Sequence, residues 1–383
     1  MALHFTRDEL AERRARAARA LAERGLDGLL CFRQESMYWL TGYDTFGYVY
    51  FQCLYLGADG RLMLLTRAPD LLQARHTSVI DDIRVWVDRH GASPAEQLRD
   101  ALASLGAKGK RLGVEWEAYG LTGNNARALE AAMQGFARLD DASRLVSELR
   151  LVKSPAELVY VREAARLADR AWDEAVALAV PGAFEGDILA AMHGAIFRGG
   201  GDYPGNNFII GSGRDALLCR YFSGRRRLDA RDQLTLEFAG TYRWYHACLM
   251  RTLFVGAPSA EHRRMYEVAR EALAASEAAL KPGNAMGDVF DAHARAIDAA
   301  GMKAFRLNAC GYSLGTTYQP NWMDWPMFYT GNPVPLAPGM VFFLHMILFD
   351  AAGGRAMTLG RTSLVTERGA EPLSAASLDL VVK

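Results

Sequence analysis

The residues best suited to do chemistry lie in the segment 232–256, DQLTLEFAGTYRWYHACLMRTLFVG. Its alternating side chains predict two adjacent strands, with Glu237 on the first and His246 on the second. A carboxylate in such an apolar run is costly to bury unless a charged or reactive group meets it. We therefore expect an active site in which Glu237 is general base or nucleophile. His246 shares a strand face with Cys248, so it should point into the same pocket as general acid or base.

Each of these residues also has a purely structural interpretation. Glu237 would then be a carboxylate paired with Arg220 or Arg251. A lone histidine such as His246 is often a hydrogen-bonded core residue. Cys248 is better read as a small space-filling side chain than as a nucleophile, because no adjacent base is guaranteed.

Composition excludes several classes of protein. The 383 residues include 44 Lys and Arg against 44 Asp and Glu, so the net charge is zero and a nucleic-acid partner is disfavoured. The five cysteines are scattered without a CxxC spacing, which fits a reducing compartment and argues against a cysteine zinc site. The N-terminus lacks the apolar core of a signal peptide, and no window is apolar for long enough to span a membrane. We expect a cytoplasmic protein.

Two regions must position these residues, and the character of the chain changes between them near 142–157. The first has the helix and strand alternation of a layered α/β domain: helices at 6–24 (capped by Thr6), 96–106 and 122–134, and strands in GLDGLLCF, 48–56, RLMLLT and RLGVEW. The second begins with a Ser154-Pro155 helix entry and has helices at 259–280 and 286–300. Its predicted strands are 207–211, 232–256, 304–312, 340–350 and 356–366.

Several motifs in this second region are similar to those of the creatinase/prolidase/methionine-aminopeptidase superfamily: VKSPAEL, GDYPGNNFIIGSG, CGYSLG, LAPGMVFFLHM and the strand pair above. The resemblance covers essentially the whole chain. It implies an α/β (α+β) fold, with a creatinase/prolidase-type N-terminal α/β domain at 1–145 and a pita-bread catalytic domain at 150–383. It also implies a homodimer, in which the region of one subunit that corresponds to Tyr43–Gln52 closes the pocket of the other.

The metal ligands of the family are replaced in this sequence. Peptidase members have two Asp, one His and two Glu, and the matching positions hold Glu237, Cys248, Tyr312, His345 and Gly360. A dinuclear site needs several carboxylates to balance the charge of two cations. We therefore expect no metal and no other cofactor. The resemblance is closest to the metal-free ectoine hydrolases, through 208–221, LTLEFAG, YHACLMRT and 311–327.

This resemblance implies further site residues. His345 would be a proton shuttle or a hydrogen-bond donor to the substrate. Tyr312 would be a donor to a developing charge, or would only fill the volume left by the metals. Arg220 would hold a substrate carboxylate, or form a structural ion pair. An aromatic loop around a carboxylate suits a delocalised cation, or is a core or dimer contact: Trp322, Asp324 and Trp325.

The sequence thus predicts a metal-independent hydrolase that opens a non-peptide C–N bond in a small carboxylated cyclic amidine or amide. One alternative is an Xaa-Pro-type metallopeptidase with atypical ligands. The other is a non-catalytic protein that binds a small molecule in the inherited pocket.

Overall fold

The computed structural model describes residues 3–221 and 224–383. The chain divides into two compact units, Met1–Arg150 and Leu151–Lys383. Each unit has its own sheet.

The first unit is built on a six-stranded sheet of order β4-β3-β2-β1-β5-β6. Its strands are β1 (Gly28–Cys31), β2 (Cys53–Gly57), β3 (Leu62–Arg67), β4 (Ile83–Trp86), β5 (Arg111–Val114) and β6 (Arg138–Asp141). Its helices are α1 (Arg7–Glu23), α2 (Gln34–Thr41), α3 (Leu71–Thr77), α4 (Pro94–Ser104), α5 (Gly123–Met133) and α6 (Leu145–Arg150). The predicted cap is present, because the Thr6 side chain accepts a hydrogen bond from the Glu9 amide.

The strand predicted at 48–56 is partly wrong. A short 3-10 helix, η1 (Gly47–Val49), precedes it, and β2 begins only at Cys53. The amide of Gly47 donates to the Thr45 hydroxyl (2.8 Å), and the amide of Tyr50 donates to the Gly47 carbonyl (3.0 Å). These local bonds compete with sheet pairing, so the β-branched and aromatic composition of the segment does not decide its conformation.

The second unit carries an eight-stranded sheet of order β11-β10-β12-β13-β9-β8-β7, with β14 paired to β13. Its strands are β7 (Ile209–Ser212), β8 (Asp232–Tyr242), β9 (Tyr245–Val255), β10 (Gly311–Ser313), β11 (Asp324–Met327), β12 (Val341–Asp350), β13 (Arg355–Thr366) and β14 (Gly369–Pro372). Its helices are α7 (Pro155–Leu178), α8 (Glu185–Arg198), α9 (Ala260–Ala279) and α10 (Met286–Ala299).

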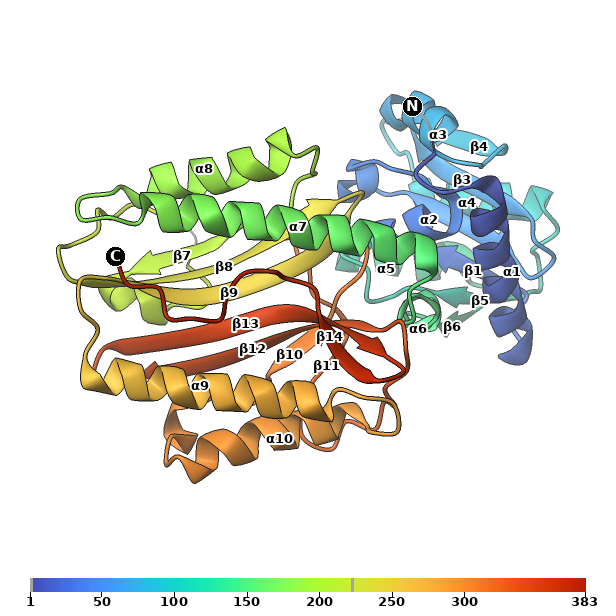
Figure 1. Ribbon diagram of the computed structural model, residues 1–383. Helices are drawn as coiled ribbons and strands as arrows, with labels where there is room; N and C mark the ends of the chain where they lie inside the picture. The colour runs from blue at the N-terminus through green and yellow to red at the C-terminus, as the bar shows by residue number, and fades with distance from the viewer. Residues whose placement is uncertain (1–2, 222–223) are drawn as a thin grey trace. The chain divides into compact units, whose positions relative to one another are not determined.

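Two similar halves make up this unit (Figure 1). Helix α7 lies along the β8–β9 hairpin, and α9 lies along the β12–β13 hairpin. Ser154 and Glu157 form a capping box at the start of α7, as the Ser-Pro entry predicts. Gly240 lets α7 approach β8, because a Cβ there would lie 1.9 Å from the Ala164 carbonyl oxygen.

Two other parts of this unit differ from the prediction made from the sequence. Of the strand expected at 304–312, only its end belongs to β10, while Lys303–Phe305 forms a short 3-10 helix, η4. Helix α8 was not predicted. Its N-cap, Phe184, makes no capping hydrogen bond, so the usual start signal is missing.

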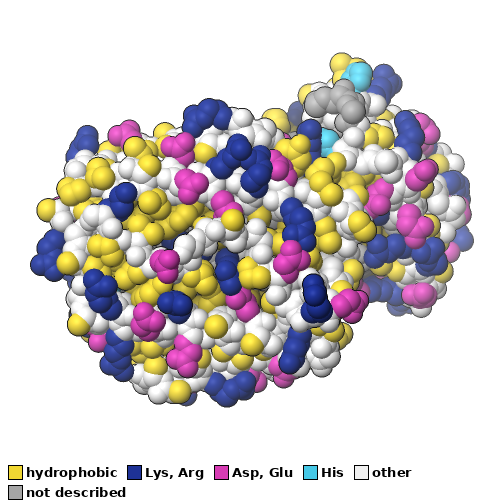
Figure 2. Space-filling model, in the orientation of Figure 1, with side chains coloured by type: hydrophobic (Ala, Val, Ile, Leu, Met, Phe, Trp, Pro, Cys, Tyr) yellow, Lys and Arg dark blue, Asp and Glu magenta, His cyan; other side chains and the backbone are white. Residues whose placement is uncertain are grey.

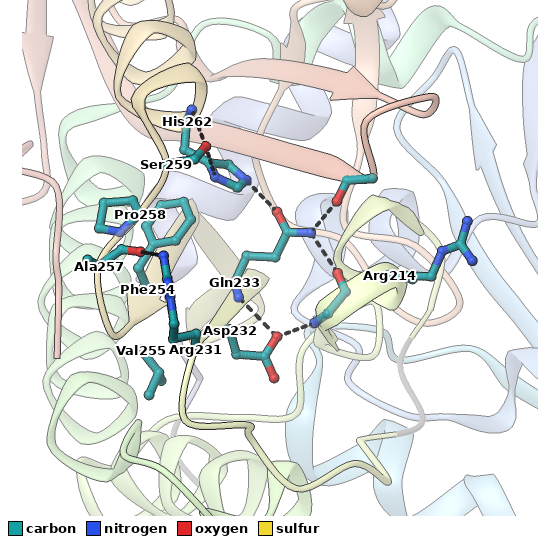
Figure 3. Close-up of a pocket in the computed structure, with 12 residues that line it drawn as sticks. Arg214, Arg231, Asp232, Gln233, Phe254, Val255, Ala257, Pro258, Ser259 and His262 are labelled. Carbon is teal, nitrogen blue, oxygen red and sulfur yellow. Dashed lines mark hydrogen bonds between the residues drawn. The ribbon is translucent and has the colours of Figure 1, made fainter.

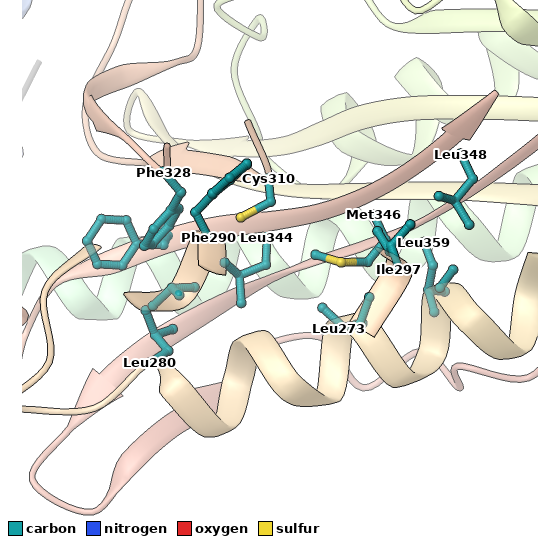
Figure 4. Packing of buried hydrophobic residues seen from close by; sticks show 14 of the residues in the cluster. Leu273, Leu280, Phe290, Ile297, Cys310, Phe328, Leu344, Met346, Leu348 and Leu359 are labelled. Carbon is teal, nitrogen blue, oxygen red and sulfur yellow. The ribbon is translucent and has the colours of Figure 1, made fainter. Parts of the chain in front are cut away.

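Strand β12 separates the core from the site by simple alternation. Leu344, Met346 and Leu348 point into the apolar cluster formed with α9 and α10 (Figure 4). His345 and Ile347 point to the other side of the sheet, where they line a cavity. The core side therefore fixes which residues of this strand can reach the cavity.

The surface agrees with the balanced composition. On the face seen in Figure 2, acidic and basic side chains are interspersed among apolar ones over the second unit. Within residues 3–221 and 224–383, no helix combines the length and the apolar character needed to cross a membrane.

Candidate active site

The sheet register places the candidate residues in one row. Glu237 of β8 pairs with Met250 of β9, Met250 with Gly360 of β13, and Gly360 with His345 of β12. Residues directly opposite each other on neighbouring strands have side chains on the same face. Glu237 and His345, which are distant in sequence, therefore face the same side of the sheet.

A cavity of about 170 Å³ lies on this face. Five of the residues predicted for the site line it: Arg220, Glu237, Tyr312, Trp322 and His345. The rest of its wall is mostly apolar, with one amide and one thiol: Asn206, Ile209, Cys219, Leu307, Ala309, Met323, Met327 and Ile347. Apolar walls and a few convergent polar groups are typical of a small-molecule site.

Glu237 is the carboxylate of this cavity. Its side chain is only 8 % exposed, and its Oε1 accepts a hydrogen bond from the Tyr312 hydroxyl (3.1 Å). Burial raises the pKa of Glu237 from 4.5 to about 7, while the Tyr312 bond and the positive charge of Arg220 act in the opposite direction. Near neutral pH the carboxyl group therefore populates both protonation states, which suits a group that accepts and returns a proton.

Tyr312 and Trp322 extend the hydrogen bonding behind Glu237. The Trp322 indole Nε1–H donates to the Tyr312 oxygen (2.8 Å). Burial and the nearby Glu237 charge raise the pKa of Tyr312 well above its usual range, so its hydroxyl keeps its proton. Tyr312 is therefore a neutral hydrogen-bond donor to the carboxylate.

His345 completes the polar end of the cavity. Its ring lies 5.7 Å from the ring of Tyr312, measured between centroids. Its Nδ1 is buried, and no described residue forms a hydrogen bond with it. Burial lowers the pKa of His345 to about 4, so the ring is neutral near pH 7. The residue lines the cavity, and a neutral imidazole has one donor and one acceptor nitrogen.

Arg220 and Asn206 complete the polar contribution to the cavity wall. Arg220 is an exposed residue that nevertheless lines the cavity, which places it at the opening. Asn206 was missed by the sequence analysis. The available signal was its place in the GNN turn just before β7, whose Ile209 pairs with Glu237. Its amide offers both a donor and an acceptor to a ligand.

His246 does not line this cavity, and the expectation that it points there is corrected by the structure. Its Nε2 accepts a hydrogen bond from the Gly205 amide (2.8 Å), and its Nδ1 lies 3.2 Å from the Thr317 hydroxyl oxygen. Because Nε2 is an acceptor, the neutral ring carries its proton on Nδ1 and donates it to Thr317. His246 thus links β9 to the loops that hold Asn206 and Trp322. Burial lowers its pKa to about 4.

Three other expected site residues also lie outside the cavity wall. Cys248 is buried, and its backbone is bound to the Thr362 hydroxyl (2.7 and 3.0 Å). Burial, then the Glu237 charge, raises the pKa of this thiol well above its usual value, so it is not a nucleophile at neutral pH. Asp324 is buried and accepts from the Trp325 amide (2.9 Å), and Trp325 packs against the α9 and α10 core.

The residues do not fit a dinuclear metal centre. In the described part of the chain, no group of three or more His, Cys, Asp or Glu side chains is placed to hold a metal ion. The last family ligand position, Gly360, has no room for a side chain. A Cβ there would lie 2.7 Å from the Leu344 carbonyl oxygen and 3.0 Å from a ring carbon of Phe343.

A second hollow, of about 330 Å³, lies at the start of β8 (Figure 3). A network of hydrogen bonds centred on Gln233 crosses it. Gln233 accepts from His262 (3.0 Å) and donates to the carbonyls of Gly213 and Gly354 (2.7 and 2.8 Å). These bonds join β8, α9 and the β12–β13 turn, so the hollow is a structural junction.

The two units and the cavity define a protein of the creatinase and prolidase type, with an N-terminal α/β domain and a pita-bread catalytic domain. Residues 159–367 match metallopeptidase family M24, and residues 13–152 match the creatinase/prolidase N-terminal domain. The chain belongs to metallopeptidase family M24. The fold expected from the sequence motifs is therefore confirmed.

Similar proteins span almost the whole chain. The ectoine hydrolase of Halomonas elongata is 29 % identical over 100 % of this chain and 99 % of its own length. An uncharacterized hydrolase/peptidase of Sinorhizobium fredii is 30 % identical, with the same coverage. Among solved structures, the dipeptidase PepE of Mycobacterium ulcerans aligns with a TM-score of 0.85 at 25 % identity, over 99 % of both chains. These relatives place the chain among hydrolases and leave both peptide and non-peptide substrates represented.

Proposed function

We propose that this protein is a metal-independent hydrolase that opens a non-peptide C–N bond in a small carboxylated cyclic amidine or related amide. The observation that carries the proposal is Glu237, a buried carboxyl group with a pKa of about 7 that faces a small cavity without a metal-binding cluster in the described chain. The full-length similarity to an ectoine hydrolase supports a substrate related to ectoine.

The polar groups of the cavity divide the work of binding and reaction. Arg220 at the opening would hold the substrate carboxylate through charge-assisted hydrogen bonds. The indole ring of Trp322 in the wall suits the face of a delocalised amidinium. His345 would exchange a hydrogen bond with the substrate in its neutral form, because a pKa of about 4 leaves few charged rings at pH 7. Glu237 would therefore be the proton donor to the leaving nitrogen.

The water-activation route balances with Glu237 as the one proton carrier. Its carboxylate takes a proton from water while the water oxygen bonds to the amidinium carbon, and the C–N π pair moves to nitrogen. The carboxylic acid then returns its proton to the leaving nitrogen, which departs with the C–N bonding pair. The hydroxyl proton of the intermediate passes to the released amine, so the products are an amide and an ammonium group. In the covalent route, the Glu237 carboxylate adds to the same carbon, and the nitrogen leaves with the C–N bonding pair and a proton taken from water. The hydroxide that remains adds to the carbon and expels the carboxylate, and its proton passes to the released amine, so the products are again an amide and an ammonium group.

Incubation of chelator-treated protein with ectoine, hydroxyectoine, creatine and Xaa-Pro dipeptides tests this proposal. Mass spectrometry should show addition of one water to a cyclic amidine, undiminished by EDTA and nearly lost in Glu237→Gln. Activity that EDTA removes and manganese or cobalt restores would instead establish the metallopeptidase. The prolidase and dipeptidase names among the relatives favour that second candidate, whereas the replaced ligands disfavour it. Tight binding of a cyclic amidine without turnover would establish a binding protein.

We also propose that the protein works as a homodimer. The η1 region of the N-terminal unit exposes large apolar side chains, with Phe46 77 %, Val49 59 % and Tyr50 51 % exposed. Neighbouring Tyr43 and Phe51 are buried and anchor the segment. A second copy is the expected partner of these side chains. Analytical ultracentrifugation should give a dimer for the wild type and a shift towards monomer for Phe46→Ser. An unchanged monomer mass for both would reject this proposal.

A further inference from the structure

A chain of hydrogen bonds, all donated in the same direction, runs from Trp322 in the loop before β11 to the Glu237 carboxylate on β8. Trp322 Nε1 donates to the Tyr312 oxygen (2.8 Å), and the Tyr312 hydroxyl donates to Glu237 Oε1 (3.1 Å). All three side chains are buried, with exposed fractions of 1 %, 3 % and 8 % in that order. An indole N–H is only a donor, so the tyrosine oxygen must accept there and its single proton is directed to Glu237.

The direction of this chain distinguishes the two oxygens of the carboxylate. Oε1 is occupied by Tyr312. Oε2 makes no hydrogen bond with any residue in 3–221 or 224–383, and Glu237 lines the cavity. We propose that Oε2 is the oxygen that reacts, and that Trp322 is a positioning residue that selects it by fixing the Tyr312 proton on Oε1. This inference deepens the proposed function and rests on it.

Trp322 is well placed for such a role, because a hydrogen bond holds its backbone. Its backbone carbonyl accepts from the Thr317 hydroxyl (3.4 Å), which is itself bound to His246 (3.2 Å). Its ring forms part of the cavity wall. Without the indole donor, the tyrosine oxygen loses the bond that fixes the direction of its single proton. A donor bound to the tyrosine oxygen also polarises its O–H group and strengthens the bond to Glu237.

The consequence is a measurable property of Glu237 that needs no substrate. A hydrogen bond to the ionised carboxylate favours ionisation. Trp322→Phe should therefore raise the pKa of Glu237, with a roughly threefold to tenfold smaller acid dissociation constant, the range expected for one hydrogen bond. Tyr312→Phe should raise it at least as much. The double variant should equal Tyr312→Phe alone, because Trp322 acts only through Tyr312.

Difference infrared spectroscopy tests this by following the Glu237 carboxyl C=O band from pH 5 to pH 9, with Glu237→Gln as the blank. Trp172→Phe on α7 is the matched control, since it loses the same atoms from another buried tryptophan and should leave the midpoint unchanged. A wild-type midpoint in Trp322→Phe, or shifts that add in the double variant, would overturn the inference. If Trp322→Phe does not fold, a wild-type midpoint in Tyr312→Phe overturns it equally.

The kinetic readout separates this inference from the proposed function. If a cyclic amidine is turned over, Trp322→Phe should lower kcat and move the acidic limb of the pH profile upward. If no substrate is turned over, the proposed function fails while the infrared titration still decides whether the chain exists. A fall in kcat without any movement of the carboxyl midpoint would mean that Trp322 acts by another route, and would also overturn the inference.

Discussion

Substitution of Glu237 by glutamine should stabilise the protein relative to wild type, by an amount that grows as the pH rises. Burial raises the pKa of Glu237 from 4.5 to about 7, so the folded state favours the protonated carboxyl group. The contribution of Glu237 to the free energy of unfolding is therefore largest below pH 4.5. It falls as the pH rises from 4.5 through 7, where the buried group must ionise. A difference of about 2.5 in pKa, at about 1.36 kcal/mol each, gives a full cost of about 3 kcal/mol above pH 7.

Glutamine keeps the shape and an oxygen that can accept from Tyr312, but it does not ionise. The free energy of unfolding of Glu237→Gln, relative to wild type, should therefore increase by about 0.7 kcal/mol from pH 4 to pH 5 and by about 3 kcal/mol from pH 4 to pH 8. Urea unfolding followed by tryptophan fluorescence at several pH values measures this difference. Glu367→Gln, the same change at an exposed position, is the control. A wild-type to variant difference that stays constant from pH 5 to pH 8 would refute the raised pKa and the reasoning built on it.

Three other substitutions test individual parts of the site. Arg220→Gln should raise KM for a carboxylated substrate about 10- to 100-fold with little effect on kcat, because a charge-assisted contact is lost. Steady-state kinetics measures both constants, and an equal fall in kcat would place Arg220 in the chemical step. His246→Ala should lower the free energy of unfolding by about 2–3 kcal/mol, because it removes the bonds to Gly205 and Thr317. The pH profile of its remaining activity should keep the wild-type midpoint, and a lost limb would restore His246 as the acid. Gly360→Ala should lower the free energy of unfolding by about 1–3 kcal/mol, because the added Cβ would meet the Leu344 carbonyl oxygen. Chemical denaturation measures this, and an unchanged midpoint would show that the strands can separate there.

Alternation and capping signals in the sequence located most of the second unit. The hairpin at 232–256 is the pair β8 and β9, and α7 is capped by Ser154, as the Ser154-Pro155 entry predicts. These signals are local, because they depend on the side-chain period and on hydrogen bonds between near neighbours. Where local bonds opposed composition, as at η1, the expectation failed.

The position of Glu237 was predictable because its carboxylate lies in the middle of a strand, between the apolar neighbours Leu236 and Phe238. Its partners were predicted only in part. Tyr312, Trp322, Arg220 and His345 do line the cavity, and they were found through motif resemblance rather than through spacing. Asn206 was missed because nothing in a two-asparagine turn indicates which side chain faces inward.

The sequence by itself determined which strand carries the carboxylate and which family of folds the motifs resemble. Only the tertiary structure decided that Glu237 and His345 share a face through the row of Met250 and Gly360. Only the tertiary structure showed that both ring nitrogens of His246 are hydrogen-bonded, one to Gly205 and one to Thr317, although His246 lies on the expected face of its strand. The physical reason is that strand period fixes the side of a side chain, whereas loops from distant parts of the chain decide what that side chain meets.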